Sequence, residues 1–136
     1  MPWSRTRVGI FIAVLALIAA AIAIYGNQQG ARQELQQRAE AIAGGNATHG
    51  QVLFAEKGCG GCHTLKGVTQ AAGLVGPPLD GVGQRAMIAG MLANNPDNLA
   101  RWIREPQAVL PGNAMPNLPM SKQDSRDLAA FLYSKG

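Results

Sequence analysis

The chain has 136 residues, of which 47% are hydrophobic and 5% aromatic, and its 12 Lys and Arg against 8 Asp and Glu give a formal net charge of +4. This length is enough for one domain and little else. Residues 46–136 hold 8 of the basic and 6 of the acidic side chains, a net of +2. With so even a charge and so few aromatic residues, the composition argues against a nucleic-acid partner.

The N-terminal segment from Val8 to Ile24 consists of 17 apolar or glycine residues and carries no charge. As a helix it would be about 25 Å long, close to the thickness of the hydrocarbon core of a membrane. Arg5 and Arg7 precede it, and the positive-inside rule keeps that end in the cytoplasm. Trp3 and Tyr25 flank it and are expected at the two headgroup levels.

A cleaved signal peptide is the alternative, because Ala21-Ile22-Ala23 resembles an A-x-A cleavage site. The apolar stretch is longer than the 7–15 residues typical of a signal peptide, which favours a transmembrane anchor over residues 1–26. Both interpretations place the rest of the chain outside the cytoplasm. We therefore expect a single-pass protein of a bacterial inner membrane, with its main domain on the periplasmic side.

Residues 27–45 form a polar linker that is rich in glutamine and in residues of high helix propensity. Gly44 and Gly45 are suited to the turn that ends it. Two roles remain open for this predicted helix: a stalk that tethers the following domain, or a helix that packs on that domain.

The most informative motif is Cys59-Gly60-Gly61-Cys62-His63, which has the pattern C-x-x-C-H. Two thiols at this spacing can form thioethers with the two vinyl groups of one haem, and the adjacent histidine then becomes the proximal iron ligand. Gly60 and Gly61 are expected to let the backbone turn tightly. A thioredoxin-like motif would need a βαβ pattern, which is absent. A zinc site would need two further Cys or His ligands, and His49 is the one such residue outside the motif.

Other motifs surround this pattern in a defined order. They are Gly50-x-x-x-Phe54, Gly76-Pro77-Pro78-Leu79-Asp80-Gly81, Asn98-Leu99-Ala100-Arg101-Trp102-Ile103, Pro111-Gly112-Asn113-Ala114-Met115-Pro116 and Leu128-Ala129-Ala130-Phe131-Leu132. With them, residues 46–136 resemble the class I, or mitochondrial-type, monohaem cytochromes c, and are similar to the cytochrome c domain of some bacterial respiratory oxidases. The resemblance implies an all-α fold around one haem c, attached through Cys59 and Cys62.

The resemblance also implies how the iron and the haem are held. Pro77 would offer its carbonyl to the Nδ1–H of His63, which fixes the ring. Met115 would be the second axial ligand, and a thioether there raises the reduction potential. Trp102 would donate its indole N–H to a haem propionate, and Arg85 would pair with a propionate.

The predicted domain contains three other methionines, for which other roles are expected. Met120 is the competing candidate for the iron, because it lies five residues after Met115 and also follows a proline. Met87 and Met91 lie in a stretch rich in glycine and alanine and are expected to fill gaps in the core.

Capping and proline patterns predict the helices of the domain. A first helix should begin at Asn46 or Thr48 and run to about Lys57. A second should begin at Pro96, run to about Arg104 and end before Pro106. A third should follow the capping box that starts at Ser121.

The apolar face of the last helix, with Leu128, Phe131 and Leu132, is expected to cross Leu53 and Phe54 on the first. No segment shows sustained alternation, so little or no sheet is expected. The loops 64–83 and 106–119 should instead wrap the haem.

With His63 and Met115 both bound, the iron would have no open position for a small-molecule substrate. The resemblance therefore implies an electron carrier and not an enzyme. The expected partners are a quinol-oxidising complex (quinol–cytochrome c reductase) and a terminal oxidase, with the chain as a shuttle or a complex subunit. The alternative is a ligand-binding haem sensor or haem enzyme in which Met115 dissociates.

Overall fold

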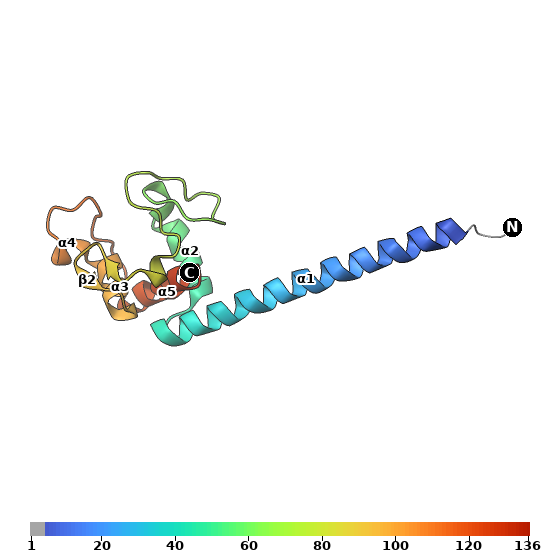
Figure 1. Cartoon of the computed structure of the whole chain (residues 1–136). Coiled ribbons are helices and arrows are strands. Elements are labelled where there is room, and N and C mark those ends of the chain that lie inside the picture. The colour runs from blue at the N-terminus through green and yellow to red at the C-terminus, as the bar shows by residue number, and fades with distance from the viewer. Residues whose placement is uncertain (1–4) are drawn as a thin grey trace. The chain divides into compact units, whose positions relative to one another are not determined.

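The computed structural model describes residues 5–136, and Figure 1 shows the course of the chain. By their contacts the described residues fall into two units, one reaching to Glu34 and the other spanning Leu35–Gly136. Trp3, which was predicted to flank the membrane segment, lies outside the described residues.

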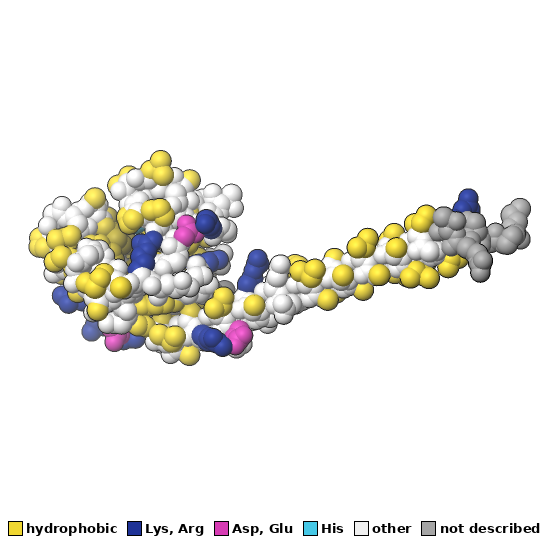
Figure 2. Space-filling model, viewed as in Figure 1, with side chains coloured by type: hydrophobic (Ala, Val, Ile, Leu, Met, Phe, Trp, Pro, Cys, Tyr) yellow, Lys and Arg dark blue, Asp and Glu magenta, His cyan; other side chains and the backbone are white. Residues whose placement is uncertain are grey.

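The first unit consists of the N-terminal part of helix α1, which runs from Arg5 to Ala43. Its apolar side chains are exposed all along the segment predicted to enter the membrane, with Leu17 71% and Ile22 66% accessible. Figure 2 shows hydrophobic side chains along the visible face of this stretch. Among the described residues, α1 is the one helix long and apolar enough to cross a membrane, by length and composition.

The last residues of α1 belong to the second unit and pack on it. Ala39 and Ala43 are 4% and 0% exposed. The carbonyl of Ala43 accepts a hydrogen bond from the Arg126 guanidinium, and the carbonyl of Gly44 accepts one from the Gln123 amide. Of the two roles open for the linker, packing on the domain therefore holds for its C-terminal end.

Helix α2, Ala47–Glu56, and helix α5, Lys122–Tyr133, form the centre of the second unit. The side chain of Asn46 accepts the His49 N–H and caps α2, while Ser121 and Asp124 form the predicted capping box of α5. Both helices therefore begin where the sequence predicted.

Phe54 and Phe131 fix the crossing of these two helices. Their rings meet edge to face with centroids 5.6 Å apart. At Gly50 the backbones come so close that a Cβ would lie 2.0 Å from the carbonyl oxygen of Asp127. The predicted crossing is confirmed, and Gly50 is the residue that allows it.

Helix α3, Pro96–Arg104, packs on α5 and is capped by Asn95, whose side chain accepts the N–H of Asn98. Pro106 ends α3 as predicted, but it also begins a further short helix, α4, Pro106–Val109. That helix was not predicted, and it places Pro106 among the most deeply buried residues.

The remaining elements are short. They are the 3₁₀ turns η1, Cys59–Gly61, and η2, Val82–Gln84, and an antiparallel hairpin of β1, Met87–Ile88, and β2, Leu92–Ala93. Ala89, Gly90 and Met91 join the two strands. Ala89 and Gly90 have positive φ, and the Met91 N–H bonds to the Ile88 carbonyl at 2.9 Å, which closes the tight turn. The prediction of an essentially helical domain is thus confirmed, with one minimal hairpin as its sheet.

Candidate functional site

A cavity of about 370 Å³ opens in the second unit, a volume typical of cofactor and ligand sites. Its wall includes all seven residues singled out from the sequence: Cys59, Cys62, His63, Pro77, Arg85, Trp102 and Met115. Most of the remaining wall is apolar and comes from α2, α3, α5 and the intervening loops: Phe54, Leu79, Val82, Ile88, Leu99, Ile103, Leu110, Leu128 and Leu132. The fold therefore joins residues far apart in sequence around one hydrophobic hollow.

The two cysteines lie at the turn that follows α2. Gly58 takes a left-handed conformation (φ 69°) and lets the chain reverse into η1. Both thiols are free; Cys59 is half-buried, and burial raises the pKa of its thiol. Two free thiols spaced i and i+3 thus line one cavity.

Gly60 and Gly61 were predicted to let the backbone turn tightly through their conformational freedom, and that reason was wrong. Neither residue takes a positive φ. Gly60 is instead needed for a close approach, because a Cβ there would lie 2.5 Å from the carbonyl oxygen of Gln70. At Gly61 a Cβ would meet nothing within 4 Å.

His63 is held by the loop that contains Gly76 and Pro77. Its Nδ1 lies 2.8 Å from the carbonyl oxygen of Pro77. A carbonyl can only accept, so Nδ1 donates this hydrogen bond, and in the neutral imidazole the lone pair then lies on Nε2. The Gly76 N–H bonds to the Cys62 carbonyl at 2.8 Å, and a Cβ on Gly76 would lie 2.2 Å from Cε1 of His63. The loop backbone therefore packs directly on the imidazole.

Met115 lies on the cavity wall, in the loop after α4. Its N–H donates to Oδ1 of Asn113 at 2.8 Å, and its carbonyl accepts from Nε2 of Gln107 at 2.7 Å. Two side-chain amides thus hold both backbone polar groups of Met115. Asn113 was part of a motif noted in the sequence; Gln107 was missed, because an isolated glutamine carries no pattern.

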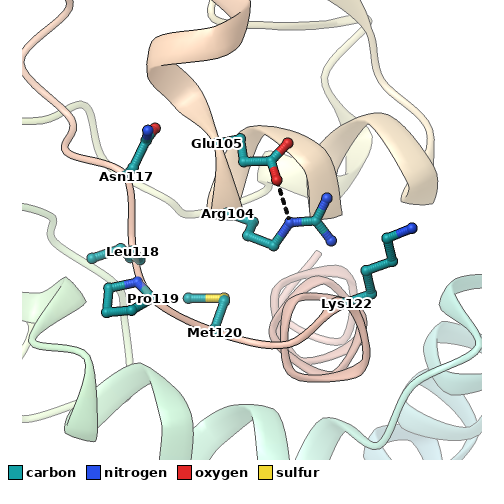
Figure 3. Close-up of a pocket in the computed structure, with 7 residues that line it drawn as sticks. All are labelled: Arg104, Glu105, Asn117, Leu118, Pro119, Met120 and Lys122. Atoms are coloured by element: carbon teal, nitrogen blue, oxygen red, sulfur yellow. Dashed lines mark hydrogen bonds and ion pairs between the residues drawn. The ribbon is translucent and has the colours of Figure 1, made fainter.

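The competing methionine does not line this cavity. Met120 lines a separate open pocket with Arg104, Leu118 and Pro119, as Figure 3 shows. Its side chain is partly buried against the hydrophobic core.

Met87 and Met91 were expected to fill gaps in the core, and that expectation was wrong. They are 47% and 53% exposed, because they lie on the β1–β2 hairpin at the surface. Met87 also forms part of the cavity wall.

Arg85 and Trp102 differ in whether the protein accepts hydrogen bonds from their side-chain N–H groups. The Arg85 guanidinium donates to the carbonyls of Pro78 and Asp80, so it fastens the loop that carries Pro77. Trp102 is half-buried on α3, and its indole N–H makes no hydrogen bond with any residue in the described part of the chain. Its donor remains free for another group.

Asn94 supports another part of the wall and was not predicted. Its Nδ2 donates to the carbonyls of Val82 and Arg85 at 2.7 and 2.8 Å, and its Oδ1 accepts from the hydroxyl of Tyr133 at 2.8 Å. The end of α5 is thereby connected to the loop that carries Arg85.

Known proteins resemble this chain over most of its length. The sequence model of the family described as Cytochrome c matches residues 47–135. Cytochrome c oxidase subunit 2 of Alkalihalophilus pseudofirmus is 40% identical over 107 residues, which cover 78% of this chain and 29% of that protein. The same subunit of Bacillus subtilis is 30% identical over 110 residues, covering 79% and 31%. The subunit of Bacillus sp. (strain PS3) is 39% identical over 71 residues, covering 51% and 20%.

The chain spans less than a third of the length of these curated relatives. Its helical domain, its cavity and its C-x-x-C-H motif coincide with the region that the family model matches. The family implies haem c as the cofactor and electron transfer as the function. On this combined evidence the chain belongs to the cytochrome c family, as a class I monohaem member with an apolar helix before its domain.

Proposed function

We propose that this chain carries single electrons on the periplasmic side of a bacterial inner membrane, through one haem c held in the cavity described above. One observation carries the proposal. Seven residues from distant parts of the sequence line one apolar cavity, and the Nδ1–H of His63 donates to the Pro77 carbonyl, which in the neutral ring leaves the lone pair on Nε2.

The residues on the wall fit a covalently held haem. Cys59 and Cys62 are free thiols and would hold it through two thioether bonds. His63 and Met115 would be the two axial ligands, a neutral imidazole and a soft thioether. The free indole N–H of Trp102 would donate to a propionate. The apolar remainder of the wall suits the porphyrin faces and keeps water away.

The protein controls the chemistry through these ligands. When bound, haem supplies a one-electron Fe(II)/Fe(III) couple. The Pro77 carbonyl holds the proton on His63 Nδ1, which orients the ring and makes Nε2 a better donor. As an iron ligand, the Met115 thioether would favour the reduced state and raise the potential. With His63 and Met115 both holding the iron, it would have no position open to a substrate.

The anchor and the charge pattern support the location. The apolar segment of α1 is long enough to span a membrane, and Arg7 stands at its N-terminal end. The positive-inside rule places that end in the cytoplasm and the domain outside. Protease added to intact spheroplasts should then digest the domain; its protection until lysis would reverse the orientation.

The proposed partners are a quinol-oxidising complex as donor and a terminal oxidase as acceptor. The names of the relatives, each a subunit 2 of cytochrome c oxidase, support a respiratory setting. Redox encounters of this kind are small and transient. Co-purification after mild detergent extraction separates a fixed subunit, which stays with the oxidase, from a free shuttle, which does not.

The deciding experiment is the visible spectrum of the reduced, haem-loaded protein before and after carbon monoxide. An unchanged spectrum is expected, because Met115 would hold the iron and leave no position open. Met115→Ala should make the protein bind carbon monoxide, whereas Met120→Ala should behave as the wild type. A clear shift in the wild type would instead favour a ligand-binding sensor or enzyme.

A further inference from the structure

We propose that Gln107 is the positioning residue that keeps Met115 at the cavity, and that it sets how tightly the sixth iron position is closed. The inference rests on the proposed function, in which Met115 is the axial ligand. Side chains make most of the hydrogen bonds that hold the loop 111–117 in place.

The backbone of this loop contributes little to its own shape. Among the described residues, its backbone-to-backbone hydrogen bonds reduce to one, from the Asn113 N–H to the Leu110 carbonyl at 3.3 Å. The flanking contact from the Leu118 N–H to the Arg104 carbonyl closes the loop at its end. A segment with so few backbone bonds must take its conformation from other groups.

The Gln107 amide supplies hydrogen bonds that the backbone of the loop does not make for itself. Its Oε1 accepts the N–H of Gly112 at 2.9 Å. Its Nε2 donates to the carbonyls of Asn113 and Met115 at 2.8 and 2.7 Å. One side chain thus satisfies three backbone groups of the loop and uses both of its amide hydrogens and its oxygen.

Gln107 is itself held in place by its neighbours. Gln107 lies in α4, directly after the fully buried Pro106. Its own N–H donates to Oδ1 of Asn117 at 3.1 Å, on the far side of the loop. Asn113 adds a second clamp, because its Oδ1 accepts the Met115 N–H while its Nδ2 donates to the carbonyls of Pro106 and Leu110. The loop is therefore folded around Gln107 and cannot shift without breaking these bonds.

This arrangement has a direct chemical consequence. Without the amide, the carbonyls of Asn113 and Met115 would turn to water and the loop would gain alternative conformations. Met115 would then occupy its position for a smaller fraction of the time. A competing ligand binds in proportion to the fraction of open protein, so a weaker clamp raises its apparent affinity.

Carbon monoxide binding to the reduced, haem-loaded protein measures that fraction. Gln107→Met keeps the length of the side chain and removes every hydrogen bond of its amide. It should raise the apparent affinity for carbon monoxide about tenfold, the effect of one to two net hydrogen bonds. Gln123→Met is the matched control, because within residues 5–136 the Gln123 amide bonds to Gly44 and Asp127 and not to the loop 111–117. It should leave the affinity unchanged.

Gln107→Glu tests the role of the donor separately from shape. The carboxylate would face the carbonyls of Asn113 and Met115 and repel them, whereas the protonated acid can donate to one of them. Its affinity for carbon monoxide should therefore fall as the pH is lowered, a dependence absent from the wild type and from Gln107→Met. A side chain that merely fills space would show no such profile.

Met115→Ala separates the proposed function from the proposed role of Gln107. If Met115→Ala does not admit carbon monoxide, Met115 is not the ligand and the proposed function fails in that respect. If Met115→Ala opens the site while both Gln107 variants match the wild type, the role of Gln107 is overturned. Should Gln107→Met fail to fold, the pH profile of Gln107→Glu decides: a flat profile contradicts the inference.

Discussion

Nδ1 of His49 lies 2.7 Å from Oδ2 of Asp127 and joins the start of α2 to the middle of α5. The His49 side chain is half exposed, whereas Asp127 is buried. This hydrogen bond raises the pKa of His49 against the opposing effect of desolvation. Burial alone would raise the pKa of Asp127, but the bonds from His49, Asn46 and Gln123 lower it. A histidine at the surface thus helps to fasten the two central helices.

The pair predicts a specific dependence of stability on pH. Because the pKa of His49 is raised, its contribution is complete below about pH 6.5, the ordinary value for histidine, and is lost as the pH rises through the folded pKa. Because the pKa of Asp127 is lowered, its contribution is present above about pH 4 and is lost as the pH falls. The pair should stabilise most between these limits, with Asp124 and Glu56 adding to the shift of His49.

His49→Gln tests this dependence, since it keeps a neutral hydrogen-bond donor and removes the charge. The difference in free energy of unfolding between wild type and variant should be largest between about pH 4 and about pH 6.5 and should shrink as the pH rises through the raised pKa of His49. Urea denaturation over a pH series measures it. A difference that stays constant with pH would show that the charge of His49 does not matter.

The close crossing at Gly50 predicts a large effect of one methyl group. In Gly50→Ala the new Cβ would meet the Asp127 carbonyl at 2.0 Å and Cβ of Phe131 at 2.9 Å, so α2 and α5 must move apart. Overpacking of this kind costs about 1–3 kcal/mol. Gln51→Ala, at the exposed neighbouring position, should change the free energy of unfolding by less than about 0.5 kcal/mol. Equal denaturation midpoints for the two variants would contradict the tight crossing.

Local signals in the sequence were enough to predict where three of the helices begin. Asn46, Ser121 and the proline at position 96 each mark a helix start through groups that act within one turn, and the structure has helices there. Phe54 and Phe131 indicated the faces that meet. Helix α4 was not foreseen, because four residues are too few for a periodic pattern.

The candidate site was predictable only where a motif carries the chemistry. The spacing of Cys59, Cys62 and His63 is itself the signal, and the family resemblance added four more residues of the same cavity wall. Their roles towards the haem stay predictions. Gln107 and Asn94 escaped notice because each acts through backbone carbonyls brought near by the fold, which no sequence pattern records.

The contact between Gly76 and His63 predicts a loss of haem attachment. In Gly76→Ala the added Cβ would lie 2.2 Å from Cε1 of the imidazole, so either the ring or the loop that carries Pro77 must shift. Disturbing the groups that orient a metal-bound histidine typically costs 10–100-fold in affinity or activity. The yield of covalently attached haem, measured by haem staining relative to total protein, should fall about tenfold.

Gly61→Ala is the matched control for that experiment. It makes the same change within the C-x-x-C-H motif, at a position where a Cβ meets nothing within 4 Å. Its haem yield should match the wild type. If both variants lose haem equally, glycine is required by the attachment step and the packing of Gly76 on His63 is not the cause.

The hydrogen bond from Tyr133 to Asn94 predicts the cost of leaving one part-buried acceptor without its partner. Tyr133→Phe keeps the packing of the ring, but Oδ1 of Asn94 loses its partner while its Nδ2 still holds the carbonyls of Val82 and Arg85. The free energy of unfolding should fall by about 1 kcal/mol. Tyr25→Phe changes the same hydroxyl on a side chain that is 64% exposed and should have no measurable effect on the domain. Urea denaturation of the haem-loaded protein compares the two variants, and an unchanged midpoint for Tyr133→Phe would mean that water replaces the hydroxyl at no cost.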